Sequence, residues 1–122
     1  MPATDRSLEL ARAAAHAAAE KLATTIVGID VSEQLAITDI FVIASAETER
    51  QVGAIVDEVE DSLREMGSKP VRREGQRDGR WVLIDFGDIV VHVQHDDERR
   101  LFALERLWHD CPPIPLLLDD RR

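Results

Sequence analysis

Two aspartates, Asp85 and Asp88, are the residues of this chain whose type and spacing best suit chemistry. They flank a glycine, and a turn there would let both carboxylates converge on a metal ion or act as an acid and a base. Carboxylates at turns more often accept hydrogen bonds from backbone N–H groups, so we expect a structural or partner-binding role. The triplet Asp85-Phe86-Gly87 also spells the magnesium-binding triplet of protein kinases. A chain of 122 residues without a Gly-rich phosphate loop is too short for a kinase, so the match is attributed to chance.

Histidine and cysteine do not suggest a metal site. His92 and His95 are three residues apart in an expected strand, where such side chains point to opposite faces and cannot bind one ion. His109 and Cys111 are close in sequence, but Cys111 is the only cysteine, which also excludes an intramolecular disulfide. No Ser or Cys has a recognisable activating context, and no Gly-rich nucleotide loop is present. The sequence therefore predicts no catalytic residue, no metal and no cofactor.

Trp81 is a candidate for binding rather than for catalysis. It follows a polar stretch and opens an expected strand, in a chain with two tryptophans. It is either a core aromatic or an exposed anchor for a protein partner, because Trp supplies a large contact area with few rotatable bonds. Phe86 lies near the turn of the same hairpin and could share that surface. The odd separation of the two residues places them on opposite faces of an ideal strand, so sharing would need a twist or a bulge.

Composition limits the class of protein. The length suits one domain, and 44% hydrophobic residues with 4% aromatics indicate a core of Ala, Val, Ile and Leu. No apolar run approaches the ~20 residues that cross a bilayer, and the N-terminus lacks the features of a secretory signal, so a cytoplasmic protein is expected. The net charge of −9 disfavours direct binding to nucleic acid and suits a basic protein partner, although acidity also serves solubility alone.

Hydrophobic periodicity and turn residues predict the elements that position these side chains. Thr4 or Asp5 is expected to cap the first helix, and Thr48 with Gln51 has capping-box spacing at the second. In chain order we expect a helix over 5–23, strands over 25–31 and 37–44, a helix over 48–66, strands over 69–73, 81–86 and 89–95, and a helix from Asp96 or Asp97 to about Trp108.

The connections predict an α/β fold with a mixed sheet of about five strands and three main helices. The short link over 32–35 favours antiparallel pairing of the first two strands. The second strand, the second helix and the third strand would form a right-handed crossover, and a turn at Gly87 would make a hairpin of the last two strands. Residues 73–80 are expected to form a mobile loop. One domain is expected over 1–111, followed by an irregular Pro-rich tail over 112–122.

Several motifs, taken in order, resemble the ribosomal silencing factors, also called the Iojap-like family. The resemblance covers roughly residues 7–111, and the longest motif is the most specific. The motifs are Ile37-Thr38-Asp39 with Phe41-Val42-Ile43, Arg50-Gln51-Val52, Glu74-Gly75, the run WVLIDFGDIVVHV over 81–93, and Glu98-Arg99-Arg100-Leu101 through Leu104-Glu105 to Leu107-Trp108.

This resemblance implies a fold similar to that of nucleotidyltransferases. It implies binding to a large-subunit ribosomal protein on the face that meets the small subunit, where the factor would block subunit joining and repress translation when nutrients are scarce. It also implies dimerisation, and it places Trp81 and Phe86 in the ribosome contact. In that contact, acidic side chains such as Asp85 and Asp88 would give orientation and a faster association rate.

Two other hypotheses remain open at this point. A metal-dependent nucleotidyltransferase or hydrolase would use Asp39, Asp85 or Asp88, but the corresponding region, over 44–47, lacks the Gly-Ser turn and the paired carboxylates of those enzymes. We therefore expect no enzyme activity. A self-assembly module would pair through an exposed strand edge or through the thin Ala-rich first helix, and this is compatible with ribosome silencing.

Overall fold

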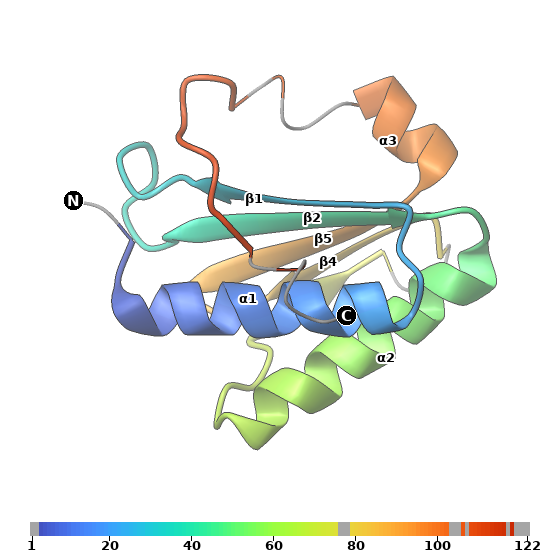
Figure 1. Cartoon of the computed structure of the whole chain (residues 1–122), viewed down its shortest axis with the longest axis horizontal. Coiled ribbons are helices and arrows are strands. Elements are labelled where there is room, and N and C mark those ends of the chain that lie inside the picture. The colour runs from blue at the N-terminus through green and yellow to red at the C-terminus, as the bar shows by residue number, and fades with distance from the viewer. Residues whose placement is uncertain (1–2, 76–78, 103–105, 107, 117, 119–122) are drawn as a thin grey trace.

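Five strands form one mixed sheet in the computed structural model, which describes residues 3–75, 79–102, 106, 108–116 and 118. Their arrangement confirms the expected α/β class with three helices (Figure 1). In chain order the elements are α1 (Asp5–Glu20), β1 (Thr25–Asp30), β2 (Ile40–Ala46), α2 (Glu49–Glu65), β3 (Arg72–Glu74), β4 (Trp81–Asp85), β5 (Ile89–His95) and α3 (Asp96–Phe102).

The strand order across the sheet is β1-β2-β5-β4-β3. β1 pairs antiparallel with β2, and β4 with β5, so both expected antiparallel pairings are confirmed. The expected crossover is only partly right, because the parallel neighbour of β2 is β5, and β3 lies two strands further away at the edge. The cause is the difference between the strands. β5 is buried over six of its seven residues and suits the centre, whereas all three residues of β3 are exposed.

Helices α1 and α2 cover one face of the sheet, as Figure 1 shows, and α3 lies on the other side. Alanines on the buried side of α1 let its backbone approach the sheet closely, and α2 contributes an apolar stripe at helical spacing. The buried residues of this stripe are Val52, Ile55, Val56, Val59 and Leu63. Most of the buried hydrophobic residues form one cluster between these helices and the sheet.

The helix caps agree with the sequence at two of three positions. Thr4 accepts a hydrogen bond from the Ser7 amide, and Thr48 accepts one from the Gln51 amide, both at 3.1 Å. The expected cap of α3 is wrong, because the helix begins at Asp96 itself. His95 Nδ1 accepts the hydrogen bond from the backbone amide of the second residue of α3 (N···N 3.1 Å). The sequence predicts that this helix ends near Trp108, and that prediction falls partly on residues outside the described ones.

The expected loop over 73–80 starts later than the composition indicates. Arg73 and Glu74 belong to β3, and Arg73 forms an ion pair with the buried Glu60 of α2. That hydrogen-bonded carboxylate raises the pKa of Arg73. The charged side chains at the start of this stretch therefore belong to an exposed edge strand, which natural sheets often protect with such residues.

Residues 112–116 run along the open edge of β1. The Asp30 amide donates to the Pro112 carbonyl, and the Ile114 amide donates to the Gly28 carbonyl, each at 2.8 Å. The division of the chain at residue 111 stays an expectation, and these five residues contact the same sheet as the preceding domain. No helix in the described part of the chain has the length and apolar character to cross a bilayer.

Leu22 gives a stability prediction. Its φ of +64° lies in the left-handed region, at the position after a helix where glycine is usual, and its side chain is 73% exposed. Leu22→Gly is expected to raise the free energy of unfolding by about 1 kcal/mol, because it removes the Cβ clash and little packing. Urea denaturation measures the change. Leu22→Ala keeps the Cβ and is the control, and an equal gain in both variants would contradict this explanation.

Candidate protein-docking surface

The alternation of β4 separates the residues singled out in the sequence. Val82, Ile84 and Phe86 point into the core under α1 and α2, and Phe86 is only 6% exposed. Trp81, Leu83 and Asp85 lie on the opposite side, which we call the second face of the sheet, and all three are half-buried. The sequence left open whether Phe86 shares a surface with Trp81, and the structure puts the two on opposite sides, because neither a twist nor a bulge overcomes the odd separation. Phe86, which the family resemblance placed in the ribosome contact, is therefore a core residue.

Trp81 combines packing with exposure. Its indole Nε1 donates to His92 Nδ1 at 3.2 Å, and it packs partly against a second apolar cluster built around Ile29, Val31 and Ile43. It also borders a surface hollow of about 280 Å³ together with Glu74, Gly75 and Leu83. Neither alternative from the sequence describes it alone, because one side of the ring is packed and the rest is accessible to a partner. We define Trp81, Leu83, Asp85 and this hollow as the docking face.

A row of aromatic rings crosses the second face from β4 to the C-terminal segment. The ring centroids of Trp81 and His92 are 6.1 Å apart, those of His92 and Phe41 are 5.0 Å apart, and those of Phe41 and Trp108 are 5.2 Å apart. The last two contacts have edge-to-face geometry, which aromatic pairs prefer. The row anchors the inner side of Trp81 and extends from the docking face toward the edge strand β1.

His92 is a residue whose role the sequence did not indicate. Burial lowers its pKa from 6.5 to about 4, so the ring is neutral at physiological pH. A neutral ring that accepts at Nδ1 carries its proton at Nε2, and that nitrogen has no hydrogen-bond partner within the described structure. The sequence suggests His92 only as a metal ligand together with His95, and strand geometry excludes that pair. The role of His92 depends on the strand pairing, which places it between Ile43 of β2 and Leu83 of β4.

Asp85 and Asp88 sit at the same turn but do different things. Asp85 Oδ1 accepts a hydrogen bond from the Gly87 amide at 2.8 Å, and its other oxygen lies 3.8 Å from an Arg72 nitrogen. Gly87 has a φ of +92°, which only glycine adopts readily, and this fixes the turn. Asp85 is thus a turn residue whose side chain is 22% exposed, whereas Asp88 is exposed.

Asp39, one of the residues suggested for nucleotidyl transfer, and Ser45 of the corresponding region are engaged in structural contacts. Asp39 Oδ2 accepts from the Thr4 amide at 3.1 Å and from the Ser7 hydroxyl at 2.8 Å, and so secures the start of α1. Ser45 is buried, and its hydroxyl lies 2.6 Å from that of Thr25. Within the described residues, no group of three or more His, Cys, Asp or Glu side chains is arranged to hold a metal ion.

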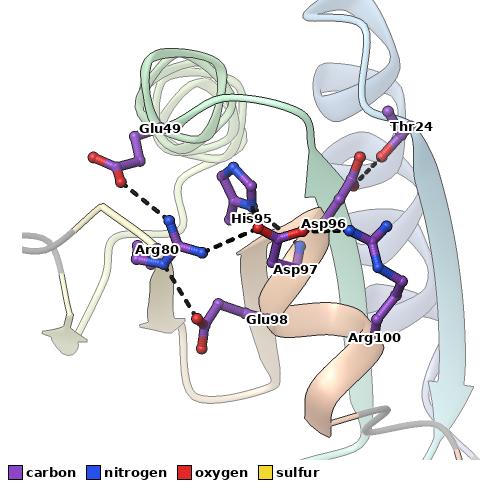
Figure 2. Close-up of polar contacts among 8 residues, drawn as sticks. All are labelled: Thr24, Glu49, Arg80, His95, Asp96, Asp97, Glu98 and Arg100. Carbon is purple, nitrogen blue, oxygen red and sulfur yellow. Dashed lines mark hydrogen bonds and ion pairs between the residues drawn. The ribbon is translucent and has the colours of Figure 1, made fainter.

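Arg80, the residue before Trp81, forms ion pairs with three acidic side chains (Figure 2). The Arg80 guanidinium contacts Glu49 at the start of α2 at 3.3 Å, Glu98 of α3 at 3.2 Å and Asp97 at 3.6 Å. The hydrogen bond that Arg80 donates to Glu98 raises the pKa of Arg80 against the opposing effect of burial. Arg80 therefore connects α3 to α2 by charge, and Asp97 also pairs with Arg100 within α3. The sequence could not reveal this network, because its members come from three separate segments.

Arg80→Gln is expected to lower the melting temperature at low ionic strength, because it unties α3 from α2. The difference from the wild type should shrink at high salt, since half-exposed ion pairs are screened. Thermal melts at two salt concentrations measure both effects. Arg64→Gln removes an exposed pair within α2 and is the matched control, expected to change little. A salt-independent loss in Arg80→Gln would mean that packing, not charge, is responsible.

Comparisons with known proteins agree with this architecture. A family model described as "Ribosomal silencing factor during starvation" matches residues 4–121. A protein of Halalkalibacterium halodurans named ribosomal silencing factor RsfS is 42% identical over 108 residues, which cover 88% of this chain and 92% of that protein. A crystal structure of a Chromobacterium violaceum protein superposes with a TM-score of 0.79 and 33% identity, covering 83% of this chain and 84% of that one.

A more distant relative extends the similarity beyond bacteria. The mouse protein named mitochondrial assembly of ribosomal large subunit protein 1 is 30% identical over 83 residues, which cover 66% of this chain and 36% of that protein. The family model spans nearly the whole chain, and the closely matching relative covers most of it. The chain therefore belongs to the ribosomal silencing factor family.

Proposed function

We propose that this protein binds a ribosomal protein on the intersubunit face of the large subunit and so blocks joining of the small subunit. Translation would fall as a result when nutrients are limiting, and the site of action would be the cytoplasm. The family model names silencing during starvation, and the name of the mouse relative refers to assembly of the large ribosomal subunit. The first name supports a role in silencing the ribosome, and the second supports the choice of the large subunit as the partner.

The observation that carries the proposal is the half-exposed Trp81 on a sheet face that α1 and α2 leave uncovered. An aromatic anchor beside a hollow of about 280 Å³ suits a contact in which a partner side chain fills the hollow. Leu83 adds apolar area beneath that side chain. Phe86 is left out of the proposed contact because it is buried in the core.

Charge indicates which part of a ribosome suits this protein. A net charge of −9 is repelled by the phosphates of ribosomal RNA, so the contact must be made to basic protein surface. Asp88 is exposed, and Asp85 is partly exposed, at the same end of β4. We expect them to steer the approach of a basic partner and to set its orientation, with a smaller contribution to affinity than Trp81.

Steric exclusion requires no chemical step, so the protein would act without catalysis and without a cofactor. A domain that occupies a subunit-joining surface prevents joining simply by being there. Incubation with magnesium and nucleoside triphosphates should accordingly give no pyrophosphate. Product formation that Asp85→Asn abolishes would overturn the proposal of a non-enzymatic factor.

Sucrose-gradient sedimentation with isolated subunits tests the function directly. The protein should sediment with large subunits and not with small ones, and adding it before the two are mixed should reduce the amount of joined ribosomes. Comigration with the small subunit alone, or unchanged subunit joining at saturating protein, would contradict the mechanism.

A second copy of this chain is the other proposed partner. The edge of β1 already carries residues 112–114, whereas the three-residue strand β3 has an exposed edge. The Ala-rich side of α1 is buried against the domain's own core, so pairing through that helix would need the fold to open. Light scattering gives the mass in solution. A mass that stays monomeric at high concentration would remove the proposed homodimer.

A further inference from the structure

The second face of the sheet is covered on one side and open on the other. Residues 108–116, which we call the strap, start on the covered side, where Trp108 packs edge-on against Phe41 and Cys111 contacts the second apolar cluster. The strap then passes around the edge strand β1, so that Ile114 packs against the first cluster on the α1 side of the sheet. The open side is the docking face around Trp81. The aromatic row connects the two sides through His92 and Phe41, and the strap covers the end of the row that is far from Trp81.

The strap is seated over Gly28 in the edge strand β1. A Cβ at this position would lie 3.0 Å from Leu116 Cδ2 and 3.2 Å from Ile114 Cβ, and the three nearest heavy atoms all belong to the strap. Real Cβ atoms rarely have such close neighbours, so the absence of a side chain at Gly28 is what lets the strap approach. Figure 1 shows this segment, in red, crossing β1 and ending beside α1.

Few polar contacts hold the strap. Two main-chain hydrogen bonds connect it to β1, and Arg12 Nε of α1 donates to the Pro115 carbonyl at 3.0 Å. Prolines at 112, 113 and 115 have no N–H to donate, so the strap cannot form a full ladder with β1. By contrast, β1 and β2 are paired over six residues. Segments with few backbone hydrogen bonds open at a lower free-energy cost than core strands, so the strap can leave while the sheet stays intact.

We propose that the strap is an autoinhibitory cover of the ribosome-docking surface, and that its release lets an apolar side chain of the ribosomal protein take the place of Trp108 beside Phe41. The inference rests on the proposed function and adds its regulation. With the strap seated, a partner contacts the docking face alone. With the strap released, the contact extends along the aromatic row toward β1, and the affinity observed is reduced by the fraction of molecules in which the strap is seated.

Gly28→Val tests the inference with the whole chain. The added side chain meets the strap and no other segment among its nearest atoms, and a β-branched residue suits the strand. Cys111 is the single cysteine, lies half-buried in the strap and reports its release through the rate of alkylation by iodoacetamide. We expect the alkylation rate and the affinity for isolated large subunits each to rise on the order of tenfold. A rise of this size is expected when the strap is seated in most wild-type molecules and released in the variant.

Two variants make the test decisive. Gly53→Ala, where an added Cβ has open space, controls for glycine replacement and should change neither readout. Arg12→Met removes the hydrogen bond to Pro115 without touching β1, and should shift both readouts in the same direction by a smaller factor, even if Gly28→Val fails to fold.

The outcomes separate this inference from the proposed function. Unchanged alkylation in both Gly28→Val and Arg12→Met means that the strap is not displaceable. Faster alkylation with unchanged or weaker subunit binding means that the strap does not cover the docking surface, although the wild type still binds. If the wild type and every variant fail to bind large subunits, the proposed function falls and the inhibitory role falls with it.

Discussion

Trp81→Ala is expected to weaken binding to isolated large subunits by roughly 30- to 1,000-fold, which corresponds to ~2–4 kcal/mol for the loss of a buried aromatic anchor. The fold should survive, because one side of the indole is already accessible to solvent and Val82 and Ile84 keep β4 attached to the core. The variant loses the hydrogen bond to His92 and one end of the aromatic row, so a small fall in stability accompanies the loss of binding.

The second tryptophan provides the matched control. Trp108→Ala removes the same side chain from the strap, so if the strap is inhibitory it should leave subunit binding intact or strengthen it. Binding is measured by cosedimentation, and circular dichroism verifies the fold of both variants. Unfolding of Trp81→Ala would identify Trp81 as a core residue, and undiminished binding by a folded Trp81→Ala would remove it from the contact.

Local patterns predict most of this fold. The alternation in β4 already separates Trp81 from Phe86, and the structure follows that alternation strictly. The caps at Thr4 and Thr48 and the β4–β5 hairpin depend on neighbours within a few residues, so the sequence contains all the information needed for them. A surface shared by Phe86 and Trp81 needed a deviation from ideal strand geometry, and no such deviation occurs.

Long-range neighbours could not be read from the sequence. β5 rather than β3 lies beside β2. The reason is that β5 consists mostly of residues that can be buried on both faces of the sheet, whereas β3 consists of charged residues. The aromatic row depends on that order, because it brings Phe41 of β2 next to His92 of β5. The position of the strap depends on the absence of a side chain at Gly28, whose importance appears only when Leu116 is packed above it.

His92 makes the stability of the protein depend on pH. Its pKa is lowered from 6.5 to about 4 by burial, whereas the unfolded chain binds the proton with an ordinary affinity. The stabilising effect of keeping the ring neutral is complete above about pH 6.5 and is lost progressively as the pH falls to about 4. The difference corresponds to about 3 kcal/mol in the free energy of unfolding. The upper part of the slope lies above the pH range in which ordinary carboxylates titrate.

Other groups act in a different pH range or in a different way. Burial alone would raise the pKa of Asp30, but hydrogen bonds from the Ser32 hydroxyl and amide and from the Ala3 amide outweigh it and lower that pKa from 3.8. Asp30 therefore stabilises the fold above about pH 4, and its contribution is lost only as the pH falls further. A loss of stability between pH 6.5 and 4.5 is accordingly assigned to His92.

Urea unfolding of the wild type and of His92→Phe across pH 8 to 4 tests this assignment. The phenylalanine keeps a ring beside Phe41 and cannot bind a proton, so the variant should lose the slope between pH 6.5 and 4.5. Its stability at pH 8 should also be lower, because the Trp81 indole loses its acceptor. His109→Gln, at an exposed position, should retain the wild-type slope. The same slope in His92→Phe would show that another group is responsible. If the slope is absent, protonation of His92 is what breaks the contact behind Trp81, because a charged imidazole has only donors at its nitrogens.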